Sequence, residues 1–169
     1  MSEHEIAPPS AWVVRWAPLI ARGRALDLAC GAGRHARLLA ERGLEVVAVD
    51  REPREIAGVR FVQADLEGGN RWPFAGERFT GIVVTNYLHR PLFAHLAESL
   101  APGGVLIYET FMAGNERFGK PSNPEFLLRP GELLAAFRAL RVVAFEQGPL
   151  AVPRPAMIQR LCAVRETRG

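Results

Sequence analysis

The chain of 169 residues contains no apolar run that approaches the roughly 20 residues needed to cross a bilayer. Its first residues, Met-Ser-Glu-His-Glu, also lack the basic start and the long apolar centre of a signal peptide. We therefore expect a cytoplasmic protein without a membrane partner. The length suits one sheet covered by helices, so we expect residues 1–169 to form a single domain.

Cysteine is scarce. Only Cys30 and Cys162 are present, and their spacing matches neither a metal site nor a disulfide framework, so no metal is expected. Cys30 lies in a glycine-containing turn that calls for a small side chain, and we interpret it as filler rather than as a nucleophile.

The chain also has no concentrated run of one charge. Lysine and arginine exceed aspartate and glutamate by 21 to 18, and the arginines are scattered along the chain. A solvated, arginine-rich surface accounts for this balance better than a nucleic-acid site, and a small anionic substrate fits it equally well. Nucleic acid is therefore not the expected partner. No oligomeric state is predicted.

A third glycine is missing from the turn that follows the first apolar strand. The turn contains Gly31 and Gly33, and Ala36 stands where a dinucleotide-binding fold places its third glycine. Alanine is tolerated there, so this difference weighs only mildly against a dinucleotide. A Cβ at either glycine would obstruct a ligand that approaches the backbone.

Two acidic residues accompany this turn. Asp50 ends the second strand, where a carboxylate can accept hydrogen bonds from both hydroxyls of a ribose. Asp27 lies inside the first strand, where it would repel the phosphates of a dinucleotide and attract a cationic ligand. The pattern favours a nucleoside-bearing cofactor with a positive end.

These residues carry a family resemblance. The run Leu26-Asp-Leu-Ala-Cys-Gly-Ala-Gly-Arg-His35 resembles motif I of the class I S-adenosylmethionine-dependent methyltransferases. Val46 to Asp50 is similar to their second motif, and Phe61 to Leu66 to their third. The chain is also similar to compact small-molecule methyltransferases of the tellurite-resistance type. The resemblance implies an α/β fold with a Rossmann-like, seven-stranded, mostly parallel sheet, an antiparallel edge strand, and helices on both faces.

The resemblance also implies S-adenosylmethionine as cofactor. In the family, the residue that matches Asp50 holds the ribose, Asp65 and Leu66 hold the adenine, and the turn from Asp27 to Gly33 holds the methionine part. The predicted cofactor-binding residues are Asp27, Ala29, Gly31, Ala32, Gly33, Arg34, Asp50, Arg51, Asp65, Leu66 and Asn86.

The segment after the fourth strand is where the family places substrate and donor methyl. Tyr87 can present its ring face to a sulfonium. His89 has the pKa range of a general base, but a histidine at a helix start is as often a polar cap. Arg90 could bind an anionic substrate or form a surface salt bridge.

Glu109 ends the fifth strand near the same cleft. It could orient His89, bind a cationic substrate, or pair with Arg90 or Arg117. We take His89, Tyr87 and Glu109 as the candidate catalytic residues. His35, beside the cofactor turn, is a further candidate; a contact from Arg34 or His35 to the cofactor carboxylate is the simpler interpretation.

The remaining pattern predicts the other elements. We expect residues 1–22 to form an N-terminal covering helix, capped by Ser10 and packing Trp12, Trp16 and Ile20 inward. Residues 112–129 do not fit a minimal βαβ unit, and we expect a substrate-covering loop there. Strands are expected at 26–29, 44–49, 59–64, 79–85, 104–111, 140–145 and 157–164, and further helices at 34–42, 93–100 and 130–140.

The leading hypothesis is a methyltransferase that acts on a small molecule. Methylation of RNA or protein is an alternative, although a basic tract is absent and the sequence after Asn86-Tyr87 departs from the N-P-P-Y type of motif. A non-catalytic protein that binds S-adenosylmethionine is another alternative, and a dinucleotide oxidoreductase is more distant. The acceptor atom stays open.

Overall fold

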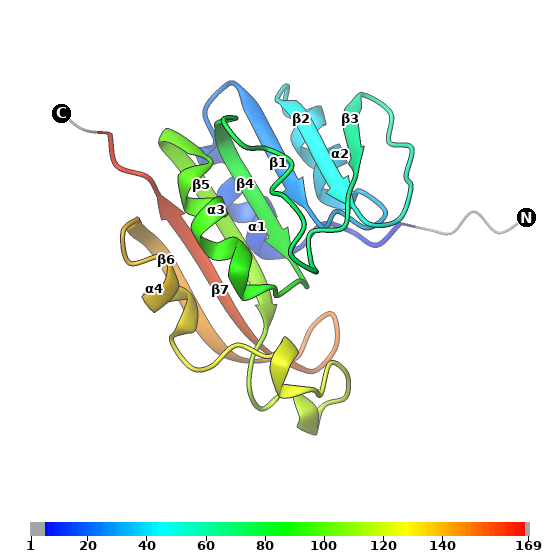
Figure 1. Ribbon diagram of the computed structural model, residues 1–169. Coiled ribbons are helices and arrows are strands. Elements are labelled where there is room, and N and C mark those ends of the chain that lie inside the picture. The colour runs from blue at the N-terminus through cyan, green and yellow to red at the C-terminus, as the bar shows by residue number, and fades with distance from the viewer. Residues whose placement is uncertain (1–5, 168–169) are drawn as a thin grey trace, which may run out of the picture.

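The computed structural model describes residues 6–167. Its strands are β1 (Arg24–Leu28), β2 (Glu45–Asp50), β3 (Val59–Gln63), β4 (Phe79–Thr85), β5 (Leu100–Phe111), β6 (Arg141–Leu150) and β7 (Ala156–Val164). They form one seven-stranded sheet in the order β3-β2-β1-β4-β5-β7-β6 (Figure 1). Strands β1 to β5 pair in parallel, and β7 is antiparallel to both β5 and β6. The predicted seven-stranded, mostly parallel sheet is confirmed. The antiparallel strand that was predicted at the edge is β7, and β6 lies outside it as the edge strand.

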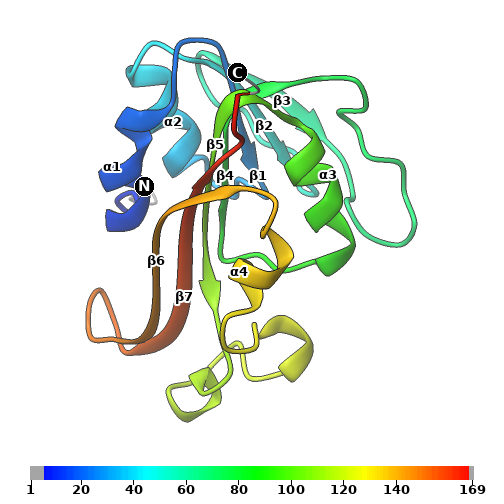
Figure 2. The same ribbon diagram turned by 90° about the vertical axis from the view of Figure 1, so that its left-hand side faces the viewer.

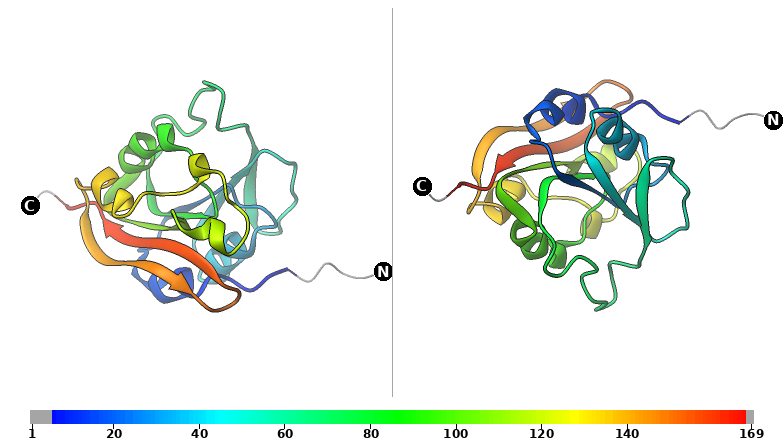
Figure 3. Two further views of the ribbon diagram at one scale, coloured as in Figure 1. Left: turned by 90° about the horizontal axis from the view of Figure 1, so that it is seen from below. Right: turned by 90° about the horizontal axis from the view of Figure 1, so that it is seen from above.

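The central strands are buried because helices cover both faces of the sheet. The helices are α1 (Ala11–Trp16), α2 (Arg34–Glu41), α3 (Phe93–Glu98) and α4 (Glu132–Ala136). Helices α1 and α2 lie on one face, and α3 and α4 lie on the other (Figures 2 and 3). Each face has its own apolar cluster, with Trp12 and Leu39 in the first and Phe79 and Tyr108 in the second. Strands β2 and β4 are continuous apolar runs in the sequence because their side chains are buried on both faces of the sheet.

The chain leaves β1 toward β2 and β3, then returns to place β4 on the other side of β1. The carboxyl ends of β1 and β4 are therefore the point where the strand order reverses. Ligands of open α/β sheets bind in the crevice outside such a point. The sheet order thus selects one edge of the molecule as the place of the functional site.

Several helices are shorter than predicted. The N-terminal helix stops at Trp16 and continues as the 3₁₀ turn η1 (Ala17–Leu19), because Pro18 has no N–H to donate to the preceding turn. Its predicted cap is present, since the Ser10 hydroxyl accepts a hydrogen bond from the Trp12 N–H. Gly131, with φ of 71°, separates Pro130 from α4, which delays the start of that helix. Residues 1–5 of the expected N-terminal segment lie outside the described residues.

Strand β5 begins earlier than predicted. Leu100, expected in a helix, already pairs with Phe79, and the Pro102-Gly103-Gly104 turn forms an irregularity inside the strand. A Cβ on Gly104 would lie 2.7 Å from the Ala101 carbonyl oxygen and 2.9 Å from that of Phe79. Glycine is required there because two strands approach closely.

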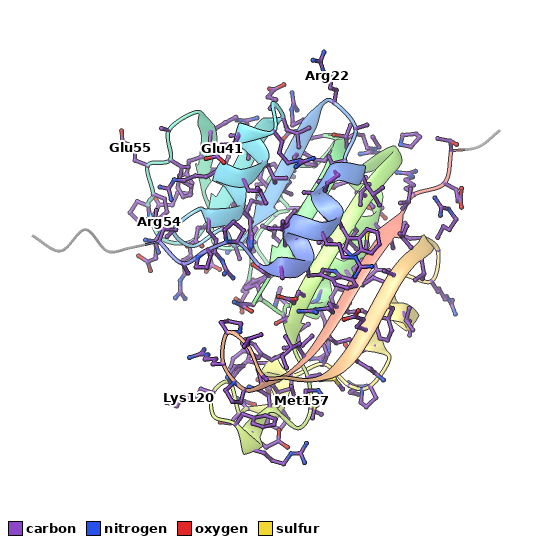
Figure 4. The ribbon with its side chains drawn as sticks, turned by 180° about the vertical axis from the view of Figure 1, so that it is seen from behind. Arg22, Glu41, Arg54, Glu55, Lys120 and Met157 are labelled. Carbon is purple, nitrogen blue, oxygen red and sulfur yellow. The ribbon has the colours of Figure 1, made fainter. Side chains whose placement is uncertain are left out.

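The segment 112–129 is an ordered excursion at the carboxyl edge. It contains the 3₁₀ turns η3 (Asn115–Arg117) and η4 (Pro124–Phe126), and its two ends meet in a bridge between Met112 and Leu128. Seen from behind, Lys120 and Met157 lie at this end of the molecule and Arg22 lies at the opposite end (Figure 4). Among residues 6–167, no helix is long and apolar enough to span a membrane.

Candidate functional site

The ends of β1 and β4 carry strained backbone. Ala29 follows β1 and Asn86 follows β4, and each has a φ of 54°. This left-handed conformation is uncommon for residues other than glycine and tends to occur at functional sites. Both strained residues stand where the strand order reverses.

The two glycines of the β1 turn are required for different reasons. A Cβ on Gly31 would meet no atom within 4 Å, so a ligand can approach this backbone. A Cβ on Gly33 would lie 2.6 Å from Cδ1 of Ile56. The open approach predicted for both glycines is therefore found at Gly31, whereas Gly33 makes room for a side chain of the protein.

Asp50 connects β2 to this turn. Its Oδ2 accepts a hydrogen bond of 2.9 Å from the Gly31 N–H, and its Oδ1 accepts one of 3.0 Å from the Glu52 N–H. Each carboxylate oxygen retains a second lone-pair direction. Asp50 can therefore order the turn and accept hydrogen bonds from a ligand at the same time.

A cavity of about 230 Å³, which we call the β2 cavity, lies against Asp50. Five predicted cofactor-binding residues line it, namely Ala29, Asp50, Arg51, Asp65 and Leu66. Ala32 and Arg34 belong to the adjoining turn and the start of α2. The Arg34 guanidinium donates to the carbonyl oxygen of Pro8 at 2.8 Å, which holds the N-terminal segment beside the turn.

Asp27 lies beneath the turn and outside the cavity wall. It is 1% exposed, and its Oδ2 accepts a hydrogen bond of 2.9 Å from the Ala36 N–H. Burial raises the pKa of Asp27 to about 7, although the Ala36 N–H and the Arg34 guanidinium act in the opposite direction. Asp27 therefore joins β1 to α2, and burial weakens the negative charge that was expected to face a cationic ligand.

His35 and Cys30 are also buried behind the turn. His35 Nε2 accepts a hydrogen bond from the Ser10 N–H at 3.0 Å, so the neutral ring carries its proton on Nδ1, which lies 3.3 Å from the Thr85 hydroxyl. Burial, assisted by Arg34, lowers the pKa of His35 to about 4. Burial raises the pKa of Cys30 to about 12, which agrees with its interpretation as filler. His35 is occupied in holding the start of α1.

A second cavity of about 280 Å³, which we call the β5 cavity, shares Glu67 and Tyr87 with the first. Its other walls are Asn86, Leu88, Thr110, Phe111, Pro121 and Phe126. They come from the ends of β4 and β5 and from the 112–129 segment. Asn86, predicted to bind the cofactor, thus lines this second cavity.

Glu67 contacts two of the candidate catalytic residues. The Tyr87 hydroxyl donates to its Oε2 at 3.1 Å, and His89 Nδ1 lies 3.8 Å from its Oε1. Burial and the Glu67 carboxylate raise the pKa of Tyr87, so its phenol keeps its proton. Tyr87 is therefore a hydrogen-bond donor and a ring face, not a base. His89 lines neither cavity, whereas its neighbour Glu67 lines both.

Glu109 has other partners than those predicted. Its Oε2 accepts a hydrogen bond of 2.8 Å from Arg160, and its Oε1 accepts one of 2.9 Å from the Ser10 hydroxyl. Successive side chains of a strand point to opposite faces, and Glu109 lies on the α1 face while Tyr108 packs on the other. The predicted pairing of Glu109 with His89, Arg90 or Arg117 is wrong, and Glu109 lines neither cavity.

Arg90 forms a salt bridge, one of its two predicted roles. Its guanidinium donates to both carboxylate oxygens of Glu132, at 2.6 and 2.9 Å, and to the carbonyl oxygens of Glu125 and Leu127. Arg90 therefore ties the 112–129 segment to α4, and its charge is paired with Glu132.

Sequence reasoning did not identify Glu67, Thr110 or Phe111 as site residues. Thr110 and Phe111 could have been found from their position at the carboxyl end of β5. Glu67 gave no such signal, because a glutamate in a polar loop is normally solvated.

The glycine turn, the acidic end of β2 and the cavities at the switch point define an open α/β protein of the type that binds a nucleoside-bearing cofactor. Residues 1–143 match the family model described as a methyltransferase domain. The chain belongs to this family, that of the class I S-adenosylmethionine-dependent methyltransferases. The predicted family and fold class are thereby confirmed.

Individual methyltransferases are also similar to this chain in sequence or in fold. The chain is 37% identical over 109 residues to trans-aconitate 2-methyltransferase of Methylobacterium nodulans, covering 58% of this chain and 42% of that protein. It spans less than half the length of the curated relatives it matches. The crystal structure of TehB from Haemophilus influenzae has a TM-score of 0.80 at 18% identity, covering 98% of this chain and 65% of that chain.

The N-methyltransferase NodS from Bradyrhizobium japonicum, in complex with S-adenosyl-L-homocysteine, has a TM-score of 0.61 at 19% identity, covering 89% of this chain and 84% of that chain. At this level of identity the two solved structures establish the fold alone. The narrower likeness to the tellurite-resistance type stays a prediction.

Proposed function

We propose that this protein binds S-adenosylmethionine and transfers its methyl group to a small-molecule acceptor. The observation that carries the proposal is a pair of cavities at the switch point that share Glu67 and Tyr87, one against Asp50 and the other against the end of β5. A transfer reaction needs two adjoining sites with the reacting atoms at their junction. Glu67 and Tyr87 stand at that junction.

The residues of the β2 cavity fit the methyl donor. Asp50 offers free lone pairs to ribose hydroxyls, Ala64 and Leu66 offer apolar surface to a purine, and Gly31 leaves the backbone open. In the reaction, the S–CH₃ bond breaks with its electron pair left on sulfur, the acceptor lone pair bonds to the methyl carbon, and any acceptor proton leaves to solvent. The ring face of Tyr87 can stabilise a nearby cation by about 0.5 to 2 kcal/mol.

Positioning is the main contribution expected from this chain, and it can supply roughly 7 to 11 kcal/mol of a barrier. The catalytic roles of Tyr87, His89 and Glu109 stay predictions. Tyr87 is supported by its place in both cavities.

The proposal predicts measurable binding and turnover. We expect calorimetry to show S-adenosylmethionine binding with a dissociation constant of about 1 μM to 1 mM, and mass spectrometry to show methylation of at least one member of a thiol, amine and carboxylate panel. NADH serves as the control ligand and should not bind. Equal binding of S-adenosylmethionine and S-adenosylhomocysteine without any turnover would favour a non-catalytic binding protein.

We also propose that residues 112–129 cover the acceptor. Pro121 and Phe126 form part of the β5 cavity wall, and Asn115 anchors the segment by donating to the Pro121 carbonyl oxygen and accepting from the Met157 N–H.

The assignment of residues 1–169 to one domain, the cytoplasmic location and the lack of nucleic-acid partners stay predictions.

Replacing Arg90 with alanine is expected to release this cover. The variant loses the hydrogen bonds to Glu132, Glu125 and Leu127, which should raise chymotrypsin cleavage at Phe118 and Phe126 by roughly tenfold. Both phenylalanines are already about half exposed. Arg117→Ala is the matched control for cleavage at Phe126, because Arg117 makes one 3.3 Å hydrogen bond to the nearby Gly114 carbonyl oxygen and otherwise lies over the neighbouring Phe118 ring. Equal cleavage of the two variants would contradict the anchoring role.

A further inference from the structure

The lining of the β5 cavity is acidic rather than basic. Its lining contains one ionisable acid, Glu67, together with the neutral polar residues Asn86, Tyr87 and Thr110. No lysine or arginine belongs to this lining within residues 6–167. The adjoining β2 cavity adds the carboxylates of Asp50 and Asp65 and the guanidinium of Arg51. A polyanion in the β5 cavity would meet the carboxylate of Glu67 and no basic side chain of that lining.

Two of the arginines near these walls are paired with carboxylates elsewhere. Arg90 is paired with Glu132, and Arg160 is paired with Glu109 and Glu146 on the α1 face. Arg117 lies over the ring of Phe118, 5.9 Å from its centroid. Arg51 lines only the β2 cavity, and its side chain is 77% exposed. Within residues 6–167, Glu67 is the one charged side chain that lines the β5 cavity.

Glu67 also has unused hydrogen-bonding capacity. Its Oε2 accepts from the Tyr87 hydroxyl, while Oε1 forms no hydrogen bond within residues 6–167 and lies 3.8 Å from His89 Nδ1. Carboxylate oxygens accept hydrogen bonds and cannot donate when ionised. The remaining wall is largely apolar, with Leu88, Phe111 and Phe126. The cavity thus combines apolar surface with one exposed anionic acceptor.

We infer that the acceptor is a small, largely apolar molecule with an N–H group, neutral or cationic, which donates to Glu67, and that a polycarboxylate is excluded. The inference rests on the proposed function, because it takes the β5 cavity as the acceptor site. Glu67 is then an acceptor-binding residue that selects by charge, and the curated relatives' named substrate does not transfer to this chain.

Three probes of one shape and different charge test the inference. Benzamidine is a cation, benzamide is neutral with an N–H group, and benzoate is an anion. Binding is measured by calorimetry on the full chain saturated with S-adenosylhomocysteine. We expect benzamidine and benzamide to bind at least about tenfold more tightly than benzoate, because the anion would face Glu67. Equal affinities, tighter binding of benzoate, or no binding of any probe at millimolar concentration would overturn the inference.

Substitution of Glu67 identifies the residue responsible. Glu67→Gln should weaken binding of benzamidine roughly ten- to a hundredfold, because a charge-assisted hydrogen bond is lost. Glu125→Gln is the control, since Glu125 precedes the wall residue Phe126 on the 112–129 segment but does not itself line the cavity, and it should leave all three affinities unchanged. An unchanged benzamidine affinity in Glu67→Gln would overturn the inference.

Different results would overturn the proposed function and the inference about the acceptor. If S-adenosylhomocysteine does not bind the unmodified protein, the proposed function is wrong. If it binds, and the protein methylates trans-aconitate, the proposed function stands and the inference about the acceptor is overturned. The expected result is binding of S-adenosylhomocysteine with no methylation of trans-aconitate.

Discussion

Replacing Asp50 with alanine is expected to weaken binding of S-adenosylmethionine about ten- to a hundredfold. The variant loses a carboxylate that can accept from the ribose hydroxyls. It also loses the hydrogen bond from the Gly31 N–H that orders the turn. Isothermal titration calorimetry of the folded variant, with folding verified by its melting transition, measures the effect.

The control for this prediction is Glu52→Gln. Glu52 lies two residues beyond Asp50, its side chain is 61% exposed, and it does not line the β2 cavity. Its substitution removes the same charge from the same edge of the sheet and should leave the affinity unchanged. A folded Asp50→Ala protein that binds as tightly as the unmodified chain would remove Asp50 from the site.

The free energy of unfolding is expected to depend on pH through two buried groups, Asp27 and His35, whose effects have opposite signs. Burial raises the pKa of Asp27 from 3.8 to about 7, so the folded state binds more protons than the unfolded state between these values. Stability from this group is present at low pH and is lost as pH rises through that window. Burial lowers the pKa of His35 from 6.5 to about 4, so stability from this group is lost as pH falls from 6.5 to 4.

The two contributions largely cancel in the unmodified chain and are separated by substitution. In Asp27→Asn, the free energy of unfolding should decrease by roughly 2 to 4 kcal/mol as pH falls through the His35 window. In His35→Gln, it should decrease by a similar amount, roughly 2 to 4 kcal/mol, as pH rises through the Asp27 window. Urea denaturation at a series of pH values measures both slopes. The double variant is the control, and its free energy of unfolding should stay nearly constant between pH 4.5 and 6.5. If the free energy of unfolding changed with pH in the same direction in both single variants, this account would be refuted.

Much of the fold follows from local pattern. Runs buried on both faces predict parallel strands, and glycines at Gly31 and Gly33 predict the turn after β1. Because parallel strands end at one edge, the sequence also placed Asp50, Asp65 and Tyr87 near one another. Helix lengths were less predictable, since Pro18 and Gly131 interrupt patterns that read as continuous helices.

The sequence by itself determined the strand pattern, the glycine turn and the acidic end of β2, because each depends on residues close together in the chain. Only the tertiary structure decided which charges are free. Arg90 and Glu132 are 42 residues apart, and Glu109 and Arg160 are 51 apart, yet each pair is neutralised by direct contact. The same packing buries Asp27 beneath the turn and leaves Glu67 at the junction of two cavities. Such outcomes depend on which sheet faces and loops pack against each other. A local sequence pattern does not specify contacts between residues that are far apart in the chain.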